Sequence, residues 1–140
     1  MHTYKIKSMK TSTIVLWILR IVASVIMLQT LYFKFSAAEE SVFIFSEMGI
    51  EPWGRITTGV FELIASILIL FSPTLLFGAI IGVGLMSGAI LSHVTVLGIE
   101  VKDDGGQLFA YALIVWLSCA IIIWVKREKL GQIFKQLNLR

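Results

Sequence analysis

Four long apolar runs constrain this chain more than any other feature of its sequence. A helix needs about 20 mainly apolar residues to cross a bilayer. Only 15 % of the 140 residues are charged, against about a quarter in an average soluble domain. The runs therefore predict an all-α integral membrane protein, a four-helix bundle that forms a single domain over residues 1–140. The expected spans are residues 14–34, 52–72, 75–98 and 107–125.

The first run follows a polar and basic start, residues 1–13, an arrangement that is also typical of a signal peptide. Ser36-Ala37-Ala38 resembles a cleavage site. However, the run is about 20 residues long, whereas a signal core has about 7–15, and Arg20 interrupts it. We therefore interpret the first run as a retained span.

The segments outside the spans are expected to lie at the membrane surface. Within residues 36–48, Ser36-x-x-Glu39 fits a capping box, and an amphipathic surface helix is predicted there. Trp53 and Arg55 are interpreted as anchors at the water-facing start of the second span. The tail, residues 126–140, alternates basic and apolar residues and is expected to lie along the surface.

Charge differs between the two sides of the expected bundle. The connections after the first and third spans contain seven acids, whereas the two ends of the chain are basic. By the positive-inside rule, both termini are predicted to be cytoplasmic, in agreement with an even number of spans. The basic residues are Lys5, Lys7, Lys10, Lys126, Arg127, Lys129, Lys135 and Arg140, and the acids are Glu39, Glu40, Glu47, Glu51, Glu100, Asp103 and Asp104.

Glu62 places a carboxylate near the middle of the second span. An ionisable group at this depth costs about 2.5–3.5 kcal/mol and usually has a partner. Arg20, at a similar depth on the neighbouring first span, is the candidate for a buried ion pair with Glu62. Two other interpretations stay open: Arg20 extends to the lipid headgroups, and Glu62 only fixes helix packing.

Further polar residues lie toward the membrane face opposite the two termini of the chain. Gln29 and Lys34 end the first span, His93 lies late in the third, and Asp104 begins the fourth. These are candidate ligand-binding or proton-handling residues, and His93 would suit proton transfer near neutral pH. Alternatively, Lys34 is an interfacial anchor, His93 a packing residue and Asp104 a helix cap. Helical spacing places one set on a single stripe of the first span: Arg20, Ser24, Met27, Leu31 and Lys34.

Other motifs limit the chemistry of the chain. Gly78-x-x-x-Gly82 and Gly84-x-x-x-Gly88 predict close helix packing along the third span, either within the chain or between two copies. A single cysteine, Cys119, excludes an intrachain disulfide and a CxxC thiol-exchange site. No metal, haem or nucleotide motif is present, and no nucleic acid partner is expected.

The chain resembles the DoxX family of small four-helix bacterial membrane proteins. The resemblance covers about Val15 to Trp124 and is carried by the order and spacing of short motifs. They are Leu19-Arg20, Tyr32-Phe33-Lys34-Phe35, Gly59-Val60-Phe61-Glu62-Leu63, Met86-Ser87-Gly88-Ala89 with His93, and Asp104-Gly105-Gly106-Gln107-Leu108-Phe109.

This resemblance implies a bacterial inner (cytoplasmic) membrane protein associated with redox enzymes. Some relatives are similar to membrane subunits of a thiosulfate:quinone oxidoreductase, and others act beside superoxide dismutase and sulfurtransferase partners. The family's polar intramembrane positions would correspond to Arg20, Lys34, Glu62 and His93.

Three functions are compatible with these features. The first is a redox-associated membrane subunit that binds a quinone or another small amphipathic molecule, with redox proteins as partners because the chain shows no redox centre. Its polar residues would hold the ligand and handle protons. The second is a small transporter or lipid-handling protein, which would need a homo-oligomer. The third is a structural or assembly factor. Whether the chain is an enzyme stays open.

Overall fold

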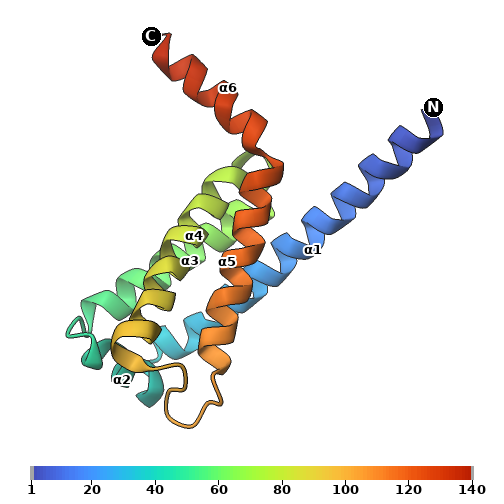
Figure 1. Cartoon of the computed structure of the whole chain (residues 1–140). Helices are drawn as coiled ribbons and strands as arrows, with labels where there is room; N and C mark the ends of the chain where they lie inside the picture. Colours follow the sequence, from blue (N-terminus) through green and yellow to red (C-terminus); the bar gives the residue numbers. More distant parts are fainter. Residues whose placement is uncertain (1, 140) are drawn as a thin grey trace.

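The computed structural model describes the backbone of residues 2–139 and the side chains of residues 11–139. Arg140 and the side chains of Lys5, Lys7 and Lys10, which contribute to the predicted orientation, lie outside the described residues. The predicted all-α fold is confirmed, and four long apolar helices form a bundle (Figure 1). They are α1 (His2–Phe35), α3 (Trp53–Leu70), α4 (Leu75–Ser92) and α5 (Gln107–Val125).

The four long helices form a closed ring around one core. Helix α1 packs against α3 and α5, and α4 packs against the same two helices from the other side. Side chains from all four helices fill the centre, and Met27, Ile69, Ala79 and Val115 are examples that are almost inaccessible. Both ends of the chain lie at the same end of the bundle (Figure 1).

Short elements connect and extend the bundle. Helix α2 (Glu39–Glu47) lies at the end opposite the chain termini (Figure 1). The 3₁₀ turn η1 (Ser72–Thr74) joins α3 to α4, and the π-helical turn η2 (His93–Leu97) extends α4. Helix α6 (Arg127–Asn138) follows α5.

The predicted capping box is wrong. Helix α2 begins at Glu39 after Ala38, without a side-chain cap. The N–H of Ser36 instead donates to the carbonyl of Tyr32 (3.0 Å), which completes the last turn of α1. Because α1 extends to Phe35, Ser36 belongs to the end of one helix and not to the start of the next.

Large apolar side chains cover the outer surface of the bundle. Ile18, Ile64, Leu91 and Leu117 are examples from α1, α3, α4 and α5, and each is exposed. Such a surface is suited to lipid and not to water. Four stretches are long and apolar enough to cross a membrane, so the chain is a small multi-pass membrane protein. They are Thr11–Phe35, Trp53–Leu70, Ser72–Leu97 and Gln107–Val125.

The two GxxxG motifs of α4 differ in their surroundings. A Cβ at Gly78 would lie 2.7 Å from the backbone nitrogen of Ile69, and one at Gly82 would lie 2.7 Å from the Sγ of Cys119. The first motif therefore brings α4 close to α3 and α5, as predicted. Gly84 and Gly88 have no atom within 4 Å of an added Cβ, so the second motif makes no close contact within the described chain. Contact with a second copy, which the motif also permits, stays a prediction.

Candidate functional site

Polar contacts follow the interface between α1 and α3 from one end to the other. Near the chain termini, the Nε of Arg20 donates to the carbonyl of Ile69 (2.8 Å) and its Nη2 to that of Leu70 (2.6 Å). These carbonyls end α3, where a cation is favourable because the helix dipole is negative there. One turn further, the hydroxyl of Ser24 donates to the carbonyl of Ser66 (3.4 Å). The two helices are therefore antiparallel and in a defined register.

This register makes the predicted Arg20–Glu62 pair wrong. Arg20 lies level with Leu70, and Glu62 is eight residues earlier in α3. At 1.5 Å per residue, that separation is about 12 Å along the helix axis, farther than an arginine side chain reaches. Arg20 instead caps α3, and its guanidinium carbon also lies 3.7 Å from the centre of the Trp17 ring.

The partner of Glu62 is Lys34. Lys34 Nζ lies 2.9 Å from Oε2 of Glu62, and the single hydroxyl proton of Thr30 is shared between the same oxygen (3.1 Å) and the carbonyl of Met27 (2.8 Å). The side chains of Lys34 and Glu62 are only 13 % and 5 % exposed. Side chains on a helix lean toward its N-terminus, so Lys34 extends back from the end of α1 toward the level of Thr30. Lys34 is therefore not a simple interfacial anchor.

Arg55 is buried, so its interpretation as an anchor at the membrane surface is wrong. It is 6 % exposed and forms an ion pair with Glu51 (2.7 Å). Its Nη1 donates to the carbonyl of Lys34, near the end of α1. Each of the two helices thus has its C-terminal carbonyls bound by an arginine of the other. The spacing of Glu51 and Arg55, four residues apart at a helix start, was a signal for their pairing.

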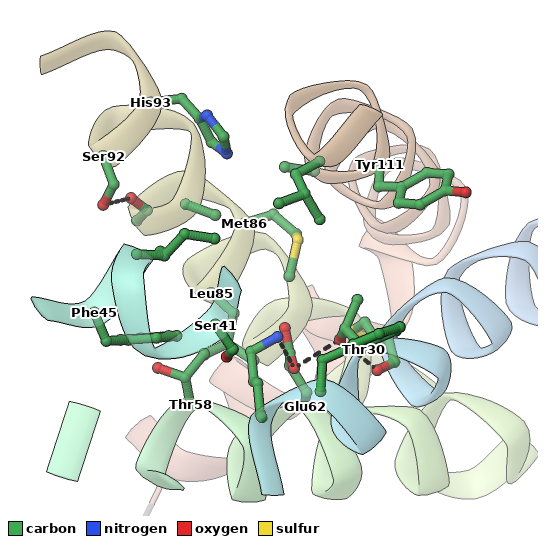
Figure 2. Close-up of a pocket in the computed structure, with 18 of the residues that line it drawn as sticks. Thr30, Ser41, Phe45, Thr58, Glu62, Leu85, Met86, Ser92, His93 and Tyr111 are labelled. Carbon is green, nitrogen blue, oxygen red and sulfur yellow. Dashed lines mark hydrogen bonds and ion pairs between the residues drawn. The ribbon is translucent and has the colours of Figure 1, made fainter. Parts of the chain in front are cut away.

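A cavity of about 560 Å³ lies beside the Lys34–Glu62 pair. Its walls come from α1, α3, α4, η2 and α5, and α2 contributes Glu40, Ser41, Ile44 and Phe45. Figure 2 shows Glu62 and Thr30 together on one side of this cavity and His93 on the opposite side. Most of the lining is apolar, as in ligand sites of similar size. The cavity therefore combines apolar walls with two separate polar regions.

The glycines of the second GxxxG motif explain why this space is not filled. Gly84 and Gly88 line the cavity and contribute no side chain to it. On the α1 and α5 walls, Gln29, Phe33 and Gln107 also line it, and all three are exposed at the surface. Glu62, on the α3 wall, is buried.

His93 has an orientation that defines its hydrogen-bonding role. Its Nδ1 lies 2.8 Å from the carbonyl oxygen of Gly98, and a carbonyl only accepts, so Nδ1 carries the proton. In the neutral ring, Nε2 is then an acceptor. The edge of the ring contacts Phe109, with the centroids 5.5 Å apart. His93 also begins the π-helical turn η2, a distortion that is frequent at functional sites.

Asp104 caps α5 and does not line the cavity. Its carboxylate accepts hydrogen bonds from the N–H groups of Val101 (2.9 Å), Gly106 (2.9 Å) and Leu108 (3.0 Å). Partial burial raises the pKa of Asp104, but these N–H groups and the nearby His93 lower it more, so the net shift is downward.

The candidate residues thus form separate groups. Glu62, Lys34, Gln29 and His93 line one cavity. Arg20 lies at the far end of the α1–α3 interface and Asp104 at the start of α5.

No protein-family model, curated protein or solved structure matches the chain. The resemblance to the DoxX family therefore stays a prediction from the residues quoted above. What the fold itself establishes is a small multi-pass membrane protein with a partly polar cavity inside its helical bundle.

Proposed function

We propose that the chain binds a small amphipathic molecule of the quinone class in the cavity beside Glu62. The observation that carries this proposal is the placement of an ion pair and a histidine on opposite sides of a mostly apolar space of about 560 Å³. Such a volume lies within the range of about 300–1,000 Å³ that is typical of small-molecule sites.

The two polar regions offer complementary hydrogen bonds. Lys34 has three N–H donors and gives one of them to Glu62. Its Nζ has no other partner among the described residues, so two donors can bind a ligand carbonyl. The Nε2 of His93 accepts a hydrogen bond from a ligand hydroxyl. A quinone offers carbonyl acceptors at opposite ends of its ring, and the corresponding hydroquinone offers hydroxyl donors. A quinone carbonyl therefore finds a donor in Lys34, and a hydroquinone hydroxyl finds an acceptor in His93.

Access from the bilayer supports a lipid-soluble ligand. The exposed lining residues Gln29 and Phe33 belong to α1 and Gln107 to α5. Helix α2 contributes to the lining at the end of the bundle. We propose that the ligand enters sideways between α1 and α5, without crossing the aqueous phase.

The proposed membrane and the proposed redox partner follow from the resemblance to the DoxX family. A DoxX-like subunit of the bacterial inner membrane, with both termini cytoplasmic, would work with a redox protein, because reducing a quinone takes two electrons and two protons. The residues near the ligand, Glu62 and His93, could transfer the protons. The electrons would come from the partner.

A structural role is the second candidate. Arg20 and Arg55 bind the helix ends of α3 and α1, and Lys34 and Glu62 join the middle of the same interface. This arrangement would hold two helices in register even without a ligand. A transporter or lipid-handling role, with a homo-oligomer, stays a third proposal without an observation that favours it.

Thermal unfolding of the full chain in lipid nanodiscs tests the proposal. A short-chain benzoquinone and its hydroquinone should each raise the unfolding temperature, since a ligand at 100 times its Kd contributes about 2.7 kcal/mol. An alkane of the same tail length serves as the ligand control. Gly88→Leu is the matched variant, because it fills the cavity from a position with free space for a Cβ.

The proposal predicts stabilisation of the wild type and none of Gly88→Leu. No effect of either ring compound on the wild type, or the same effect on both proteins, would overturn it.

A further inference from the structure

Helix α6 has no packed partner in the structure. Within its described range, Arg127–Asn138, no residue is buried, and its few contacts are with the end of α5. Figure 1 shows α6 leaving the bundle at an angle, at the end that also carries the N-terminus. A helix of 12 residues is marginal in water without packing. Its surroundings must therefore supply the missing contacts.

One face of α6 is apolar with regular helical spacing. Leu130, Ile133, Phe134 and Leu137 follow the i, i+3, i+4, i+7 pattern of a single stripe. Phe134 is 58 % exposed and Leu137 is 65 % exposed. The stripe faces no other part of the described chain.

The rest of α6 is strongly basic. Residues 126–139 contain four basic side chains and one acid, Glu128, so their net charge is +3. Helical geometry places Arg127 and Lys129 on the two flanks of the apolar stripe. Basic residues on the flanks let the stripe enter lipid while their charged ends stay at the headgroups. The other two basic residues of this segment are Lys126, which precedes α6, and Lys135.

The position of α6 in the chain places it at the membrane boundary. Only Lys126 separates it from α5, which ends at Val125. Trp124, in the last turn of α5, is 64 % exposed, and the guanidinium carbon of Arg127 lies 4.8 Å from the centre of its ring. Exposed tryptophan beside arginine at the end of a span is typical of the headgroup region.

From these features we propose that α6 is an interfacial helix that binds the surface of an anionic membrane. Its apolar stripe lies in the boundary between headgroups and acyl chains, and the flanking residues Arg127 and Lys129 contact lipid phosphates and other anionic headgroup oxygens. The occupant of the exposed stripe is lipid and not a protein, because α6 begins where the last span ends. This proposal is independent of the cavity and of its ligand.

Site-directed fluorescence on the full chain in nanodiscs tests the proposal. Cys119 is fully buried, so an environment-sensitive thiol probe can label a second, introduced cysteine selectively. Phe134→Cys places the probe on the apolar stripe, and Gln132→Cys places it on the opposite face as a matched control. Each is measured in zwitterionic lipid alone and with anionic phosphatidylglycerol.

Anionic lipid should shift the probe at position 134 to an apolar environment and leave the probe at position 132 in water. One basic residue near an anionic surface changes partitioning by about fivefold. The double substitution Arg127→Gln and Lys129→Gln, which removes the two charges that flank the stripe, should therefore lower the ratio of inserted to free α6 on the order of 25-fold.

Three outcomes would overturn the proposal. A probe at position 134 that stays in water with anionic lipid would show that the stripe does not enter the membrane. Equal insertion in neutral and anionic lipid would remove the role of charge. Shielding of position 134 in detergent alone, with crosslinking between two copies, would identify a protein partner.

Discussion

Removing the positive charge beside Glu62 should destabilise the bundle strongly. Oε2 of Glu62 has two described donors, Lys34 at 2.9 Å and Thr30 at 3.1 Å, and its side chain is 5 % exposed. Lys34→Met keeps an unbranched side chain of similar length but leaves only the neutral donor Thr30. Breaking a buried ion pair from one side costs about 3–5 kcal/mol, because it leaves an uncompensated charge. The free energy of unfolding of Lys34→Met should therefore fall by about 3–5 kcal/mol relative to the wild type.

Reversible unfolding in mixed micelles, induced by a denaturing detergent and followed by circular dichroism, measures this difference. Lys102→Met is the matched control, because it breaks the exposed pair of Lys102 with Glu39 (2.7 Å) and should have little effect. Lys34→Met combined with Glu62→Gln should recover most of the stability. The reasoning is refuted if Lys34→Met is no worse than Lys102→Met, or if the double variant is as unstable as the single one.

Three further predictions follow from the contacts of single residues. Gly78→Ala should destabilise the protein by about 1–3 kcal/mol in the same micelle assay, because the new Cβ meets the backbone of α3. Gly88→Ala, whose Cβ meets no described atom within 4 Å, should be neutral or stabilising by up to about 1 kcal/mol. The reverse order of stability would contradict the assigned packing. Arg20→Gln should cost about 1–3 kcal/mol in that assay, since it leaves the carbonyls of Ile69 and Leu70 with fewer donors, and an unchanged stability would show that α3 needs no cap. Asp104→Asn should cost about 1 kcal/mol at pH 7 through the weakened cap of α5. The pKa of Asp104 is lowered in the folded state, so its contribution to stability is complete above about pH 4 and is lost as the pH falls through the folded pKa. The free energies of unfolding of wild type and variant should therefore converge in acid.

The general fold follows from hydropathy because each span is long and apolar enough to be recognised alone. The inward-facing stripe of α1 was also predictable, since it needs only the period of a helix. Arg20, Ser24, Met27 and Leu31 are all buried, and Lys34 is half-buried. These features are local, and the sequence contains all the information that they require.

The partner of Glu62 depends on information that is not local. The predicted pair of Arg20 and Glu62 rested on their similar depths, because the sequence does not show which carbonyls end α3. Those carbonyls bind Arg20 and set the register of α1 against α3, which leaves Lys34 as the ion that reaches Glu62. Helix ends and register depend on both helices together, so charge and depth alone could not select the pair.

The cavity was likewise beyond the sequence. Gly78 and Gly84 occupy equivalent places in two GxxxG motifs, yet one contacts a neighbouring helix and the other faces open space. The difference arises because the other helices do not fill the space beside Gly84 and Gly88. Glycine permits close packing, but the neighbouring helix decides whether packing occurs.

The central claim is that the cavity beside Lys34 and Glu62 holds a small amphipathic ligand. Native mass spectrometry, with identification of released lipids and small molecules, tests it on protein purified gently from its own membrane. Wild type is compared with Gly88→Leu, which fills the cavity while keeping the ion pair, and with Glu62→Gln. The account predicts a defined quinone-like molecule on the wild type, lost from folded Gly88→Leu and reduced in Glu62→Gln. An empty wild type, or the same molecule retained on Gly88→Leu, would contradict it.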